Sequence, residues 1–150
     1  MKSLRCLIAA AALAFMVPAQ AGINDPEVIL YRVSGVVDVN SGWATIFFCT
    51  NFSGVTETLR VVVRSPSAAL MANVPVSIAH LNSVALATRP VTLFNHTNMN
   101  TDTVNPGTAA IAATSVNITC TATQVQTNTT VPLTVPLHMT RFNPIAGTQE

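Results

Sequence analysis

Charged side chains are scarce in this sequence of 150 residues: they make up 9% of the chain, and Lys2 is its single lysine. Downstream of residue 21, five arginines stand against six acidic residues, a balance of minus one. Binding to nucleic acid requires clustered basic side chains that neutralise phosphates, and binding to an anionic membrane surface requires a polybasic segment. We therefore expect neither kind of partner.

Residue patterns that carry catalysis are also missing. The chain has three histidines and one tyrosine, and it contains neither a Gly-x-Ser-x-Gly elbow nor a Ser-x-x-Lys pair. An enzyme would need His80, His96 or His138 to meet an acid such as Asp102 in one cleft. We expect a protein that is not an enzyme and that carries no cofactor.

No apolar run reaches the roughly 20 residues that a membrane-spanning helix requires. The longest run, Cys6 to Val17, follows Lys2 and Arg5 and precedes Ala19-Gln20-Ala21, a small-residue cleavage pattern. This order is typical of a secretory signal peptide. We expect residues 1–21 to be removed.

The expected mature chain, residues 22–150, has the length of a single domain. It would be exported to the periplasm or the extracellular space, without membrane insertion after the signal is removed. Cysteine is rare: Cys6 leaves with the signal, and Cys49 and Cys120 remain. An even cysteine count in an exported chain predicts a disulfide between these two residues.

Apolar residues alternate with polar ones along most of the chain, which is the period of β-strands. Val116 to Ala122 is the clearest case and points Cys120 into the core. Turn signals such as Asn105-Pro106-Gly107 separate the segments. Seven or eight strands predict an all-β, antiparallel sandwich of two sheets. The expected strands are 27–37, 43–52, 58–64, 74–81, 84–88 with 91–94, 108–114, 116–122 and 131–140.

Two of these segments have further implications. In Trp43 to Phe52 both alternating sets are largely apolar, so we expect a central strand. If this strand packs opposite the Cys120 strand, a disulfide would join two sheets about 10 Å apart where they approach locally. The segment 131–140 carries Pro132 and Pro136, which cannot donate to a ladder, so it is predicted to be an edge strand.

The two cysteines and the number of strands make the chain resemble an immunoglobulin-like sandwich, in which a disulfide joins the second and sixth strands. Two positions depart from antibody domains: Trp43 precedes Cys49 instead of following it, and Ile118 stands where the corner tyrosine would be. In size, export and strand content the chain is also similar to a bacterial surface-fibre subunit.

Histidine and methionine provide one alternative function. His96 with Met99, and His138 beside Met139, offer the soft ligands that copper sites use outside the cytoplasm. Strand alternation points His138 and Met139 to opposite faces, so these residues do not by themselves form a closed site, and we assign no metal.

Other ligands have less support. Asn98, Asn100 and Asp102 imitate the first oxygen ligands of a calcium loop, but one of the three is charged and the loop glycine is missing. Sugar binding uses exposed aromatic platforms, for which Tyr31 is the one loose candidate.

Threonine and asparagine replace the missing charges, with twenty Thr and twelve Asn after residue 21. Such a surface lacks the charge repulsion that keeps soluble proteins apart. We therefore expect a structural or interaction module that associates with itself or with another surface protein, as a subunit or accessory of a cell-surface assembly. The alternative is a small periplasmic protein that binds copper or another ligand.

Overall fold

The computed structural model describes residues 26–40, 42–129 and 133–142, and the predicted signal peptide lies outside these ranges. The described residues form strands and no helix, so none of them builds a helix able to cross a membrane. The strands are β1 (Val28–Val39), β2 (Trp43–Asn51), β3 (Glu57–Arg64), β4 (Leu70–Ile78), β5 (Ser83–Ala87), β6 (Thr97–Asn98), β7 (Val104–Ala113), β8 (Ile118–Gln126), β9 (Thr134–Pro136) and β10 (Met139–Arg141).

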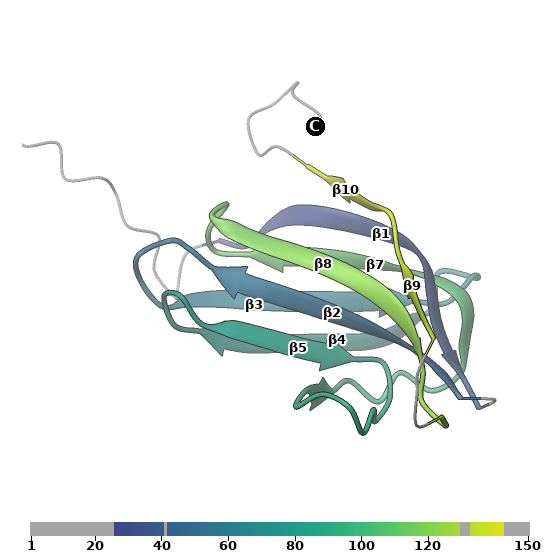
Figure 1. The fold of residues 1–150 in the computed structure, drawn as a ribbon. Coiled ribbons are helices and arrows are strands. Elements are labelled where there is room, and N and C mark those ends of the chain that lie inside the picture. Colours follow the sequence, from purple (N-terminus) through teal and green to yellow (C-terminus); the bar gives the residue numbers. More distant parts are fainter. Residues whose placement is uncertain (1–25, 41, 130–132, 143–150) are drawn as a thin grey trace, which may run out of the picture.

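The strands belong to one hydrogen-bonded sheet in the order β4-β3-β7-β1-β2-β5-β6, with β8 on β2, β9 on β8 and β10 on β1. All pairs are antiparallel except β5 with β6. The sheet curls into a half-barrel with β4, β3, β7 and β1 in one wall and β5, β2 and β8 in the other (Figure 1). The all-β prediction is confirmed, whereas two separate immunoglobulin-like sheets are not.

The curl depends on a change of partner along β1. Residues 28–38 pair with β7, but the last residues, Asp38 and Val39, also pair with Ala44 and Trp43 of β2. Between these regions the β1–β7 register shifts beside Gly35, whose φ of +76° suits glycine. Gln124 of β8 donates a hydrogen bond to the Gly35 carbonyl (2.7 Å), so the bend is tied to the opposite wall.

Inside the curl, alternate side chains of both walls form the main core. Leu59, Val61 and Val63 of β3 face Phe47 of β2 and Ile118 of β8 in one buried cluster. The outer face of β2 is apolar too, and it packs in a second cluster covered by the segment 88–103. The prediction of a central strand over residues 43–52 is therefore confirmed, and its two apolar faces have separate cores.

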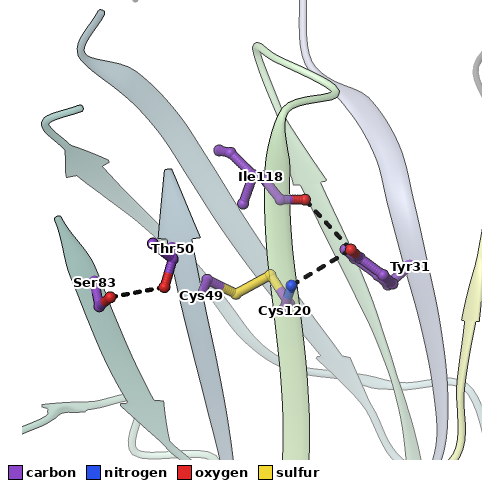
Figure 2. The surroundings of a disulfide bond; sticks show 6 residues. All are labelled: Tyr31, Cys49, Thr50, Ser83, Ile118 and Cys120. Atoms are coloured by element: carbon purple, nitrogen blue, oxygen red, sulfur yellow. Dashed lines mark hydrogen bonds between the residues drawn. A yellow bond between two sulfur atoms is a disulfide. The ribbon is translucent and has the colours of Figure 1, made fainter. Parts of the chain in front are cut away.

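The predicted disulfide Cys49–Cys120 is present, but it does not join two layers. The two residues lie directly opposite each other on the neighbouring strands β2 and β8, with Cα atoms 4.1 Å apart (Figure 2). Closely spaced Cα atoms are typical of the pairs in an antiparallel ladder that exchange no hydrogen bonds with each other. Strand alternation correctly pointed Cys120 inward, but it carried no information about which strand lies beside β8.

Tyr31 of β1 closes the half-barrel against the outer edge of β8. Its hydroxyl donates to the Ile118 carbonyl (3.3 Å) and accepts from the Cys120 amide (3.4 Å), as Figure 2 shows. Further along the same edge of β8, the Ala122 carbonyl accepts from the Leu137 amide (2.9 Å). The Tyr31 ring is therefore buried and is no sugar platform, which corrects the sequence-based suggestion.

The C-terminal segment continues this closure. Instead of one edge strand over 131–140, β9 pairs with β8 and β10 pairs with β1, so the chain crosses from one wall to the other between them. Residues 130–132 lie outside the described ranges, which leaves Pro132 untested. Pro136 pairs with Thr123 at the end of β9.

Three other predictions differ from the structure. Residues 91–94 form no strand and belong to the covering segment, in which the unpredicted β6 lies. Asn105-Pro106-Gly107 is part of β7 rather than a turn, and the glycine allows the close approach of the neighbouring strand, since a side chain at Gly107 would overlap the Arg64 carbonyl. The expected strand 74–81 begins earlier, at Leu70, and ends at Ile78.

Replacing Cys49 and Cys120 together by alanine should lower the free energy of unfolding by about 4 kcal/mol, because the disulfide closes a loop of 71 residues in the unfolded chain. Equilibrium urea unfolding measures the change. Reduction of the native protein breaks the cross-link but keeps both sulfur atoms, so it measures the effect of the cross-link apart from the loss of sulfur packing in the alanine variant. A loss below about 1 kcal/mol in both experiments would contradict the prediction.

Tyr31→Phe should cost about 1–3 kcal/mol of unfolding free energy, because the Ile118 carbonyl and the Cys120 amide lose their partner in a buried place. Thr50→Val is the matched control, since it removes a hydroxyl from the exposed Thr50–Ser83 hydrogen bond. We expect less than about 0.5 kcal/mol there. Equal effects of the two substitutions in urea unfolding would be evidence against the closing role of Tyr31.

Candidate functional site

The three candidate copper ligands have different surroundings in the structure. The Nδ1 atom of His96 donates to the Phe94 carbonyl (2.7 Å), and its Nε2 accepts from the Val91 amide (3.3 Å). Met99 is buried in the main core, while His138 is exposed between β9 and β10. Across the described ranges, no three His, Cys, Asp or Glu side chains gather where they could hold a metal ion.

Nor do the histidines meet Asp102. The Nδ1 atom of His80 accepts the Gly54 amide (3.0 Å) and so holds two neighbouring loops together. Asp102 lies instead in a polar hollow of about 310 Å³. The residues that line this hollow are Asp38, Asn40, Thr88, Arg89, Pro90, Asn100, Asp102 and Thr103.

Buried threonines fix the covering segment 88–103 to the sheet beside this hollow. The Thr88 hydroxyl accepts the Thr45 amide (3.0 Å) and donates to the Val37 carbonyl (2.9 Å). The Thr45 hydroxyl accepts the Val37 amide (2.8 Å). β1, β2 and the segment after β5 therefore share one network of hydrogen bonds.

Asp38 is the buried acid of the hollow. Burial raises the pKa of its carboxyl above the ordinary value, while a hydrogen bond from the Thr101 hydroxyl (3.0 Å) and the Arg89 guanidinium (3.4 Å) act in the opposite direction. Arg89 also donates to the Val39 carbonyl. The hydrogen bonds and the ion pair among Asp38, Thr101 and Arg89 can hold the covering segment in place. They provide no acid–base pair with a histidine.

A second candidate lies at the opposite end of the half-barrel, on the left in Figure 1, where the loops after β2, β4 and β7 come together. We call residues 52–56, 79–82 and 115–117 the apolar end. Three large apolar side chains are exposed there: Phe52 by 53%, Leu81 by 65% and Val116 by 37%.

Backbone hydrogen bonds join these three loops. The Phe52 amide donates to the Asn117 carbonyl (2.9 Å), and the Leu81 amide donates to the Asn51 carbonyl (2.8 Å). No Asp, Glu, Lys or Arg occurs in residues 49–56, 79–88 or 113–123. Arg141 lies at the margin, where its Nη2 donates to the Val116 carbonyl (2.9 Å).

The conformation of Leu81 is the unusual feature of this end. Its φ is +61°, in the left-handed region that costs an ordinary residue about 1–2 kcal/mol. Asn100 and Asp102 share this region, but short polar side chains adopt it more readily than leucine does. Leu81 is thus strained, and its exposed side chain gains little burial in return.

The sequence did not reveal this site, because Phe52 and Leu81 were placed at the ends of predicted strands. The segment His80-Leu81-Asn82 contains no glycine or proline that would mark a turn. The one available signal was the absence of charge from all three loops, which composition alone does not locate in space.

Asp38→Asn should gain stability relative to the native protein as the pH rises. Because the folded-state pKa of Asp38 is raised above 3.8, the folded protein holds its proton to higher pH than the unfolded chain does. The contribution of protonated Asp38 to the free energy of unfolding is fully present below pH ~4, and it is lost as the pH rises through the pKa of the folded state. Asparagine cannot ionise and avoids this loss.

Urea unfolding of both proteins from pH ~3 to pH ~7 measures the difference. Asp102→Asn, which removes an exposed carboxylate from the same hollow, controls for the loss of one negative charge. A difference between Asp38→Asn and the native protein that stays constant with pH would contradict the assignment.

Comparisons with known proteins add little to this geometry. The sequence matches no protein-family model and no curated protein. Among solved structures it is similar to one titled "Crystal Structure of Thermotoga maritima 1070", with a TM-score of 0.49 and 10% sequence identity over 77% of this chain and 95% of that chain. No family is identified by this similarity.

Proposed function

We propose that this protein is an exported, non-catalytic interaction module that associates with another protein surface through the apolar end. The observation that carries the proposal is Leu81, a strained and exposed leucine in the same group of hydrogen-bonded loops as two further exposed apolar residues, Phe52 and Val116. Backbone strain of this kind is found at binding sites, where the strained residue serves function rather than stability.

The energetics of Leu81 support this assignment. Asparagine or glycine would adopt the same φ with less strain, and a polar side chain would suit the exposed position. Leucine is therefore a poor choice for stability here. Burial against a partner would use the side chain, since a fully buried leucine gains about 1.5–3 kcal/mol over an exposed one.

The apolar end is also held in a fixed shape. The buried side chain of Asn51 donates to the carbonyls of Val55 (2.7 Å) and Ile78 (2.8 Å), and its oxygen accepts the Ser53 amide (2.8 Å). The disulfide at Cys49 lies two residues before Asn51 on the same strand. A rigid surface loses little conformational entropy on binding, which favours association.

Among the described strands β4 pairs with β3 alone, and association through its other, free edge is less favourable than association through the apolar end. The amide and the carbonyl of Thr58 both form hydrogen bonds with Thr114, which follows β7. The direction of the backbone groups alternates from residue to residue along a strand, so the amide and carbonyl of Arg60, two residues further on, also point toward β7. Pro75, which pairs with Arg60, therefore has its nitrogen on the free edge of β4. Proline has no amide hydrogen, so an added strand would lose a hydrogen bond near the middle of this edge.

Export is part of the proposal. The signal-like residues 1–21 lie outside the described ranges, but a disulfide is compatible with an oxidising compartment. A subunit or accessory of a cell-surface assembly fits these features. The alternative of copper binding has less support, since Met99 is buried and both ring nitrogens of His96 are hydrogen-bonded.

Leu81→Asn should raise the free energy of unfolding by about 1 kcal/mol and at the same time release the protein from its assembly. Urea unfolding measures stability, and native gel electrophoresis of the exported fraction from its host measures assembly. Leu133→Asn is the matched control, because Leu133 is 64% exposed and lies outside the apolar end. We expect Leu133→Asn to leave assembly unchanged.

The proposal would be wrong if the native protein migrates as a monomer in the exported fraction and also stays monomeric when it is purified and concentrated. It would also be wrong if Leu81→Asn remains in the assembly while its stability rises, since the strain would then have no connection with binding.

A further inference from the structure

We infer that the partner of the apolar end is a second copy of this chain, docked on the same surface across a two-fold axis. The inference rests on the proposed function and names its partner. In such an isologous contact every group near the axis faces its own copy, so the surface must be complementary to itself.

Charge is the first test of self-complementarity. A carboxylate or guanidinium near a two-fold axis would face a like charge, which is destabilising. The three loops of the apolar end contain no Asp, Glu, Lys or Arg, in a chain whose described charges lie elsewhere or at the margin with Arg141. The Nδ1 atom of His80 accepts a hydrogen bond from the Gly54 amide (3.0 Å) within these loops.

Hydrogen bonding is the second test. The exposed polar residues of these loops include Asn82, Asn117 and Thr56. An amide or hydroxyl side chain carries both donor and acceptor atoms, so it can pair with its own copy across the axis, whereas a carboxylate or guanidinium cannot. The apolar side chains of Phe52, Leu81 and Val116 have no polarity to match and pack against identical groups.

The size of the surface sets the expected strength. The apolar end comprises twelve residues, about half of the 20–30 residues that each partner contributes to a standard interface. Interfaces at the small end of the range are commonly weak and transient, so we expect a concentration-dependent dimer with a Kd on the order of 10 μM rather than a permanent one. The exported protein would then assemble where it accumulates.

Substitutions that introduce a negative or a positive charge at residue 81 test this arrangement directly. The purified exported protein, with its disulfide intact, is examined by sedimentation velocity from ~1 to ~500 μM, a range that brackets the expected Kd. We expect the native protein to change from monomer to dimer over this range. Leu81→Glu and Leu81→Arg should each raise Kd more than tenfold, because each places like charges opposite one another.

An equimolar mixture of Leu81→Glu and Leu81→Arg should restore dimerisation, because opposite charges then face each other across the axis. Leu133→Glu is the control that adds the same charge elsewhere and should dimerise like the native protein. Circular dichroism and the thermal midpoint of each variant confirm that it is folded.

A native protein that stays monomeric at the highest concentration overturns the inference. So does Leu81→Glu dimerising like the native protein, or a mixture that fails to associate, since residue 81 would then not face its own copy. If purified protein is monomeric while the exported fraction contains an assembly that Leu81→Asn dissolves, the second copy is excluded and the proposed function stands. If neither preparation shows association, both are wrong.

Discussion

The fold depends on β1 belonging to both walls of the curled sheet. Its first part pairs with β7, and its end passes Gly35 and pairs with β2, so the two walls are one hydrogen-bonded surface rather than two stacked layers. The Tyr31 hydroxyl then ties the first part of β1 to the edge of β8. One strand therefore fixes the distance between the walls, and the core packs within that distance.

This arrangement explains how the disulfide and the apolar end are related. Cys49 and Cys120 join β2 to β8 inside one wall, with Cys49 three residues before Phe52 and Cys120 two residues after the start of β8 at Ile118. The cross-link and the side chain of Asn51 hold these loops at fixed positions. Rigidity at this end of the molecule thus arises from the sheet itself, while the polar hollow at the other end is stabilised by Asp38, Arg89 and buried threonines.

Local patterns in the sequence predicted strands well where one face is buried. Alternation over β8 placed Cys120 correctly, because side-chain period follows directly from strand geometry. Strand neighbours depend on contacts far apart in the chain, so the sequence did not show that Cys49 and Cys120 share a ladder. At Asn105-Pro106-Gly107 a local turn signal competed with close backbone packing against Arg64, and the packing prevailed.

The candidate site was less predictable, because residue type alone pointed to His96, Met99 and His138, whereas the left-handed conformation of Leu81 arises from the connection between the two walls. Pro75 has a further consequence for so weakly charged a chain. Electrostatic repulsion contributes little to keeping the molecules of such a chain apart. Pro75 removes one hydrogen bond from any strand that adds to this edge of β4, and it thereby opposes fibril growth along the edge without the need for surface lysines.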